Sequence, residues 1–169
     1  MKTAVFYEHI LEGAKQSGKS VAELMEKCAS WNIRGIEIGD ALLRENKEEI
    51  RELLEKNHMQ VSCSNAFYDF GHNPDAAQGK KQIDLAEEFG VSKVLIIPGE
   101  LSENEASALN ALSASKEQTY SYMSENASLQ NMVQALKELV AYGKEKNILV
   151  TLEDFDGPVQ PFARTYQLL

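Results

Sequence analysis

The sequence predicts an α/β fold in which parallel strands alternate with helices. Short apolar runs recur along the chain, and amphipathic segments of helical length separate them. The residues that join a helix to the next strand also repeat, since Glu55-Lys56-Asn57 and Glu145-Lys146-Asn147 stand at equivalent places. Repetition of one βα unit implies parallel strands joined by right-handed crossovers. Five strands are expected, over residues 3–7, 33–38, 59–64, 91–97 and 148–152.

Start and stop signals mark the helices between these strands. Ser20 stands three residues before Glu23, which is the spacing of a capping box, and Gly90 is suited to end a helix. Asn73-Pro74 favours a helix start because proline fits the first turn. The long polar stretch 100–126, with a short helix over 103–112, is interpreted as a lid over a substrate or as a surface excursion. The other helices are expected from residue 46, over 129–140 and from Pro161 onward.

The composition fits one folded domain covering residues 1–169. Hydrophobic residues make up 43% of the 169 residues, and no apolar run is long enough to cross a membrane. The net charge is −9, and the basic residues are scattered among acidic ones, which excludes nucleic acid and an anionic membrane as partners. No signal peptide is visible, and Cys28 and Cys63 are interpreted as buried thiols, so a cytoplasmic location is expected.

Glu153 is the strongest candidate for chemistry. It ends the apolar run 148–152 and is followed closely by Asp154 and Asp156. In parallel α/β folds the carboxyl ends of the strands hold the site, and carboxylates are ligands of divalent metals. Glu153 is therefore the candidate catalytic residue and metal ligand, whereas each aspartate taken singly is interpreted as an ordinary loop residue.

Three further residues are predicted to bind substrate at the same ends of the strands. Glu37 lies inside the run Ile36-Glu37-Ile38, so its carboxylate should be buried and needs a partner. A structural salt bridge to a neighbouring strand is an equal alternative for Glu37. His9 follows the first strand, and His72 follows the third strand, where an ordinary loop residue is the alternative.

A second motif indicates a different function. Gly13 to Ser20 reads G-A-K-Q-S-G-K-S and matches the phosphate-loop pattern, in which backbone N–H groups, a lysine and a hydroxyl hold phosphates and Mg²⁺. Polar residues separate this motif from the strand before it, and the strand 91–97 ends in Pro98-Gly99 rather than in an aspartate. Nucleotide binding is kept as an alternative, beside a plain polar connection that ends in the Ser20 cap.

Three segments together resemble the xylose-isomerase-like TIM barrels, a superfamily of sugar phosphate isomerases and epimerases that also includes AP endonuclease family 2. The resemblance spans essentially the whole chain and is carried by Gly35 to Ile38, Val94 to Gly99 and Val150 to Asp154. It implies a divalent metal (Mn, Co, Mg or Zn) held by Glu153 and by an Asp, a His and a Glu from three later strands. It also implies a small sugar or sugar-phosphate substrate, isomerised or epimerised through an enediolate, with Glu37 on the substrate side.

About five of the eight βα units of a complete barrel are expected in this sequence. The chain is expected to be truncated after the fifth strand, so the three later metal ligands are missing and catalytic competence is left open. The first and fifth strands would be open edges of an apolar sheet, which favours a homo-oligomer that covers them. A non-catalytic, self-associating remnant of the barrel is the alternative to an enzyme.

Overall fold

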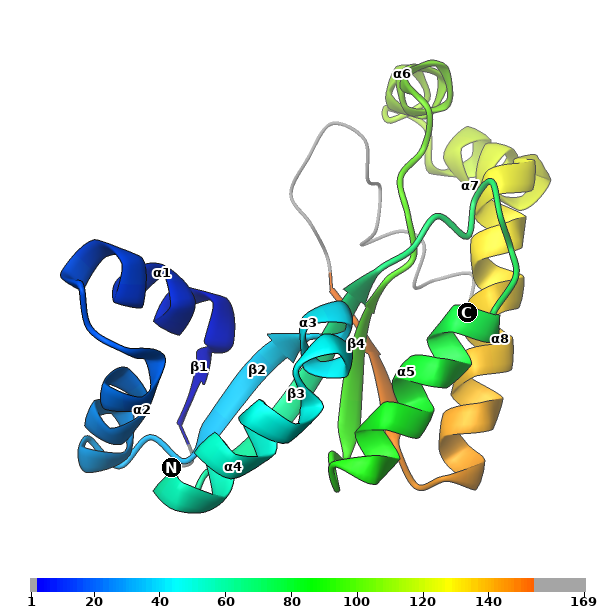
Figure 1. The fold of residues 1–169 in the computed structure, drawn as a ribbon. Coiled ribbons are helices and arrows are strands. Elements are labelled where there is room, and N and C mark those ends of the chain that lie inside the picture. Colours follow the sequence, from blue (N-terminus) through cyan, green and yellow to red (C-terminus); the bar gives the residue numbers. More distant parts are fainter. Residues whose placement is uncertain (1–2, 154–169) are drawn as a thin grey trace.

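The computed structural model describes residues 3–153 as a sheet of five parallel strands in the order β1-β2-β3-β4-β5, with helices packed along it (Figure 1). Neighbours in sequence are therefore neighbours in space, as in a β/α barrel that is not closed. The elements are β1 Ala4–Phe6, α1 Tyr7–Ser17, α2 Val21–Ser30, β2 Gly35–Gly39, α3 Asp40–Glu45, α4 Lys47–Asn57, β3 Gln60–Phe67, α5 Ala77–Glu88, β4 Lys93–Ile97, α6 Glu103–Ala111, α7 Lys116–Glu125, α8 Ala127–Glu145 and β5 Leu149–Leu152. The predicted α/β class and all five predicted strands are confirmed.

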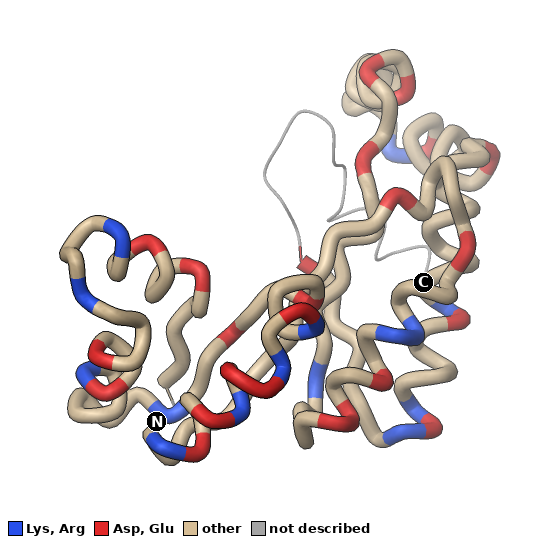
Figure 2. Tube along the Cα trace, in the orientation of Figure 1, with Lys and Arg blue, Asp and Glu red and all other residues tan. Residues whose placement is uncertain are grey.

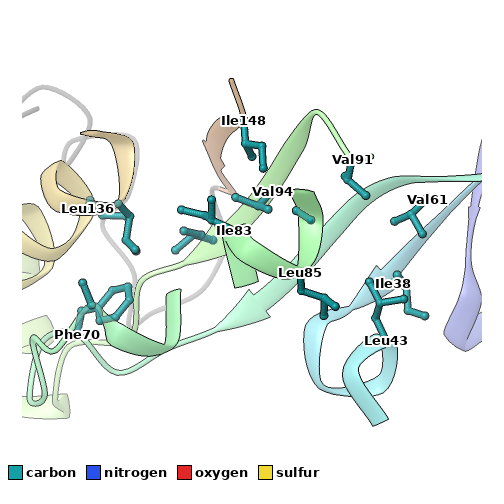
Figure 3. Packing of buried hydrophobic residues seen from close by; sticks show 14 of the residues in the cluster. Ile38, Leu43, Val61, Phe70, Ile83, Leu85, Val91, Val94, Leu136 and Ile148 are labelled. Atoms are coloured by element: carbon teal, nitrogen blue, oxygen red, sulfur yellow. The ribbon is translucent and has the colours of Figure 1, made fainter. Parts of the chain in front are cut away.

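One face of the sheet packs against the helices and forms the core. Alternate strand residues such as Ile36, Ile38 and Val94 are fully buried there. Side chains of α5 and α8, including Ile83 and Leu136, complete the same apolar layer (Figure 3). The period-two alternation of a strand sends the intervening residues to the opposite face. We call that second face the open face, because no helix of the described residues packs against it.

The open face carries exposed apolar side chains. Phe6, Phe67 and Leu149 are 44%, 69% and 63% exposed, and strand register places them on the same side as Glu37. Within residues 3–153, β1 and β5 also have one unpaired side each. The predicted open edges are therefore confirmed for the described part of the chain.

A bulge in β3 decides which residues reach the open face. Ile36 pairs with Val61 but Glu37 pairs with Cys63, so Ser62 is an extra residue in β3. The Ser62 hydroxyl donates to the Ile36 carbonyl, 2.8 Å away, and anchors the bulge. Beyond this point the open face receives Cys63, Asn65 and Phe67. Straight alternation from the start of the strand would have placed Ser62, Ser64 and Ala66 there.

The capping box at the start of α2 is confirmed, and it contributes to the correction of the phosphate-loop prediction. Ser20 Oγ accepts from the Glu23 N–H, and the Glu23 carboxylate accepts from the Ser20 N–H. Gly13 to Ser17 form the end of α1 instead of a loop. The helix uses their N–H groups internally, and the Ser20 hydroxyl is occupied by Glu23. The predicted phosphate loop is therefore wrong, and the alternative of a polar connection holds only for residues 18–20, which end in the predicted Ser20 cap.

The long segment after β4 is more helical than predicted. The short helix is confirmed as α6, but α7 was not expected in this polar stretch, and α8 begins two residues before the predicted helix. Ser102 caps α6 in a second capping box, and Asn126 caps α8 while its Nδ2 donates to Glu105 Oε1 at 2.9 Å. Although burial opposes it, these hydrogen bonds lower the pKa of Glu105 to about 2. The carboxylate thus joins the starts of two helices.

Ion pairs connect the outer helices, where residues of both charge signs are distributed (Figure 2). Lys146 after α8 reaches Asp84 and Glu87 on α5, and Lys47 on α4 reaches Glu88. No helix within residues 3–153 is both long and apolar enough to span a membrane. Asp154, Asp156 and the helix predicted from Pro161 lie outside the described residues. Helix α5 begins at Ala77, three residues after the predicted start at Pro74.

Candidate functional site

Two hollows lie side by side at the carboxyl ends of the strands. The first, of about 420 Å³, lies between the ends of β2 and β3 and is lined by Gly39, Asn65 and Gln78 among others. The second, of about 410 Å³, lies between the ends of β3 and β4 and is lined by Asp69, His72 and others. Phe67 and Tyr68 line both hollows. The end of β3 is therefore the partition between two parts of one rim.

Glu37 lies on the open face, and the charge of Glu153, directly after β5, acts on it through space. Glu37 is half-buried in the middle of β2, and Asn65 Nδ2 donates to its Oε1 at 3.4 Å. Glu153 is exposed directly after β5. Burial raises the pKa of Glu37, the charges of Glu153 and Glu8 raise it further, and Asn65 and Lys93 oppose the rise. Because burial holds Glu37 closer to its neutral form, its carboxyl group is suited to exchange a proton with a ligand.

The alternative of a structural salt bridge for Glu37 finds no support in the described residues. None of their ion pairs within 4.0 Å involves Glu37. Its polar contact is the amide of Asn65, and the ammonium of Lys93 acts on it only at longer range. A half-buried carboxylate without an ion-pair partner is a feature of sites rather than of stabilising networks.

Replacing Glu37 by glutamine is expected to stabilise the protein at neutral pH. Because the folded-state pKa of Glu37 is raised, its ionised form costs stability above that pKa, and the cost disappears as the pH falls below the ordinary glutamate value. After allowance for solvent screening, the expected gain is about 0.5–1 kcal/mol at pH 7 and none near about pH 4. Urea unfolding at both pH values measures it, with Glu52→Gln on the exposed side of α4 as control. A loss of stability at pH 7 would instead identify a structural salt bridge.

His72 is paired with Asp69 in the hollow between the ends of β3 and β4. Its Nδ1 is 2.7 Å from Asp69 Oδ1, and both side chains are more than half exposed. The hydrogen bond to Asp69 and the charge of that carboxylate raise the pKa of His72, and Glu105 raises it further. Asp69 was interpreted from the sequence as an ordinary loop residue, and the i, i+3 spacing to His72 was the signal that could have found the pair.

His9 stands apart from these hollows. It lies in the first turn of α1 with its ring edge against Phe6, at a centroid distance of 5.4 Å. It lines a small apolar hollow with Trp31, Cys28 and other residues of β1, α1 and α2. The structure therefore places Glu37 in the middle of β2, Glu153 directly after β5 and His72 in the hollow after β3, whereas it places His9 at the β1 edge of the sheet.

Two residues that support the rim had no signal in the sequence. Glu8 Oε1 accepts from the Gly39 N–H at 2.8 Å, which fixes the end of β2 to α1. Gln82 is fully buried on α5, where its Nε2 donates to the carbonyls of Ser64 and Leu95. Both contacts join segments far apart in sequence, so only the fold reveals them.

The described residues do not form a metal site on their own. No group of three or more His, Cys, Asp and Glu side chains within residues 3–153 could hold a metal ion. Catalytic zinc sites take three protein ligands, whereas the open face offers the two carboxylates of Glu37 and Glu153 among the described residues. Glu153 is thus a single candidate ligand. The carboxylates of the described residues do not fit a bound metal unless further ligands join them.

The fold and its rim define a β/α-barrel protein with a carboxylate-bearing mouth. A comparison with protein families matches residues 25–168 to the family described as xylose isomerase-like TIM barrel. The chain therefore belongs to this family, which confirms the resemblance seen in the sequence. A search of curated proteins found no match.

Solved structures share the fold at low sequence identity. D-psicose 3-epimerase from Clostridium cellulolyticum H10, crystallised with D-tagatose, is 12% identical and superposes with a TM-score of 0.58 over 92% of this chain and 53% of its own. A xylose isomerase domain protein from Planctomyces limnophilus is 14% identical and superposes with a TM-score of 0.52 over 92% of this chain and 54% of its own. Mannonate dehydratase from Streptococcus suis serotype 2 is 14% identical, with a TM-score of 0.51 over 95% of this chain and 56% of its own. The chain thus spans about half the length of the solved structures that it matches.

Proposed function

We propose that this protein is a sugar isomerase- or epimerase-like member of its family, whose rim binds a small sugar or sugar phosphate. The observation that carries the proposal is the half-buried carboxylate of Glu37 on the open face, with the amide of Asn65 beside it and the charge of Glu153 acting on it. Sugars present hydroxyl groups in several directions, and carboxylates and amides are the side chains that accept and donate hydrogen bonds to them. In a second crystal structure, D-psicose 3-epimerase was studied in the presence of D-fructose, which makes ketoses the first ligands to test.

The chemistry that fits these two carboxylates is proton transfer next to a carbonyl. In this proposal Glu153 takes a proton from the carbon beside the sugar carbonyl, which gives an enediolate, and the proton returns to one of the two carbons. Glu37 hydrogen-bonds the substrate from the neighbouring part of the same open face. A divalent metal remains an expectation from the family with Glu153 as ligand, and further ligands would have to complete its coordination.

Removing either carboxylate is expected to weaken sugar binding. Glu37→Gln and Glu153→Gln should each raise the Kd for D-fructose or D-tagatose roughly five- to tenfold, because each loses a charge-assisted hydrogen bond. Calorimetry or ligand-observed NMR measures the affinity, and chromatography of the incubated sugar, with and without Mn²⁺, tests for conversion. The matched control is Glu52→Gln, which lies on the outer surface of α4. Unchanged affinity in both rim variants would refute the proposal, whereas binding without conversion would favour the non-catalytic alternative.

A self-associating protein is the second candidate, and the open face favours it. The exposed residues Phe6 and Leu149 belong to β1 and β5, and each of these strands has one unpaired side in the described part of the chain. Such a surface is a template for pairing with another copy. Light scattering over a range of concentrations is expected to show a dimer or larger species, and Leu149→Lys is expected to shift the population towards monomer. A monodisperse monomer at all concentrations would exclude this candidate.

A further inference from the structure

The hollow between the ends of β3 and β4 contains an aspartate–histidine pair. His72 Nδ1 and Asp69 Oδ1 are 2.7 Å apart, and both side chains line the hollow. When Asp69 accepts the proton on Nδ1, the neutral imidazole keeps its lone pair on Nε2. The pair therefore presents a hydrogen-bond acceptor of defined tautomer at the rim.

The backbone beneath this pair is held in place by the end of β4. The Phe70 N–H donates to the Pro98 carbonyl at 2.9 Å, and the Asn73 N–H donates to the Asp69 carbonyl at 2.8 Å. Gly99 has a φ of 130°, and a Cβ there would lie 3.2 Å from Asp69 Cα. The absence of a side chain at Gly99 thus permits the close approach of the loop that carries the pair. A binding group fixed in this way needs little ordering when a ligand arrives.

The remaining walls are mostly apolar. Tyr68 lines the hollow, its ring stacks on the buried Phe70 with centroids 4.6 Å apart, and its hydroxyl donates to Gln82 at 2.9 Å, so it is already satisfied. Ile97 and Leu101 add buried aliphatic surface to the lining. An apolar wall with a few polar groups is the usual composition of a small-molecule site.

The charges around the hollow disfavour an anionic ligand. Among residues 3–153, its lining contains Asp69 and Glu100 but no lysine or arginine, and Glu105 of α6 also acts on His72. From α8, Asn131 contacts the same loop through the Gly71 carbonyl, and Asn131 carries no charge. A phosphate or carboxylate would meet uncompensated negative charge here, whereas a hydroxyl group would not.

We propose that this hollow is a subsite for the uncharged, hydroxyl-bearing part of a sugar, and that Asp69 is a positioning residue that prepares His72 to accept a hydrogen bond from it. The inference rests on the proposed function and narrows the substrate to a sugar without a phosphate at this end. Protonation removes the acceptor on His72, so affinity falls as the pH drops through the pKa of His72.

NMR of the three histidines provides the test, because His9, His58 and His72 lie at different places. D-fructose is expected to shift the signals of His72 alone, and D-fructose 6-phosphate is expected to bind no more tightly than D-fructose. Asp69→Asn should weaken D-fructose binding roughly three- to tenfold and move the midpoint of its pH dependence to lower pH. His72→Gln should weaken binding and abolish that midpoint, and His58→Asn is the control.

Each failure has its own signature. Loss of binding in Glu37→Gln with unchanged affinity and pH profile in Asp69→Asn would overturn the subsite and leave the proposed function standing. If D-fructose 6-phosphate binds more tightly than D-fructose and shifts the signals of His72, the proposal that this hollow takes an uncharged ligand is overturned. An absence of binding by either sugar would overturn both proposals. The melting temperature of each variant shows whether it is folded. We expect the Asp69 and His72 variants to fold, because both side chains are more than half exposed.

Discussion

Gly143→Ala is expected to destabilise the protein by about 2–3 kcal/mol, even though alanine is the better helix former. A Cβ at Gly143 would lie 2.7 Å from the carbonyl oxygen of Ile148 and 3.0 Å from Val150 Cγ2. The first neighbour is backbone and cannot rotate away. The Ile148 N–H also donates to the Gly143 carbonyl at 2.8 Å, so moving the strand apart would lose this hydrogen bond. Strand β5, which carries Glu153 at its end, depends on this contact.

Urea unfolding of the purified variant measures this effect, and Gly13→Ala is the matched control. Gly13 is also helical, but its nearest neighbour is Leu24 Cδ1 at 3.3 Å, the flexible end of a side chain. The control is expected to be neutral or slightly stabilising, since alanine favours a helix and Leu24 can shift. Equal effects of the two substitutions would show that the contact with Ile148 is not the cause.

Gln82→Leu is expected to cost about 3 kcal/mol, although leucine has a similar volume and prefers a helix. Gln82 is fully buried, donates to the Ser64 carbonyl at 3.0 Å and to the Leu95 carbonyl at 3.3 Å, and accepts from the Tyr68 hydroxyl at 2.9 Å. Leucine would leave a buried hydroxyl and buried carbonyl oxygens without this partner, and each such group costs about 1 kcal/mol or more.

A double-mutant cycle with Tyr68→Phe separates these contributions. If the Tyr68–Gln82 hydrogen bond matters, the double variant is expected to be less destabilised than the sum of the single variants. The control for the helix itself is Gln78→Leu, one turn earlier on α5 and exposed, which should change the unfolding free energy by about 0.5 kcal/mol or less. A small effect of Gln82→Leu would mean that other groups or water satisfy the carbonyls.

Local patterns predicted the strands and several helix starts because the determinants are short in sequence. Ser20 and Glu23 form their capping box as expected, and the apolar runs became β1 to β5. Helix α1 was missed because the glycine and polar residues of Gly13 to Ser17 looked like a loop, whereas their helix is stabilised by packing of Tyr7 and Ile10 in the core. Tertiary burial overrode local propensity there.

The site was predicted only in part for the same reason. Glu37 and Glu153 were found because a carboxylate within or after an apolar strand is visible in the sequence. The contribution of Asn65 depends on the bulge at Ser62, and the hydrogen bond of Glu8 to Gly39 spans 31 residues. Neither a change of register nor a long-range hydrogen bond leaves a mark in a single sequence. The roles of Glu37, Glu153, His9 and His72 remain predictions.

Because of the bulge, β3 can change in length by one residue without changing which side chains its carboxyl end presents on the open face. With Ser62 looped into the bulge, Asn65 still stands opposite Gly39. A chain that lost Ser62 would regain regular pairing with β2 and would keep Cys63, Asn65 and Phe67 on the open face. The strand can therefore tolerate the loss of Ser62 during evolution, whereas the loss of a residue nearer Phe67 would move the side chains that follow to the other face of the sheet.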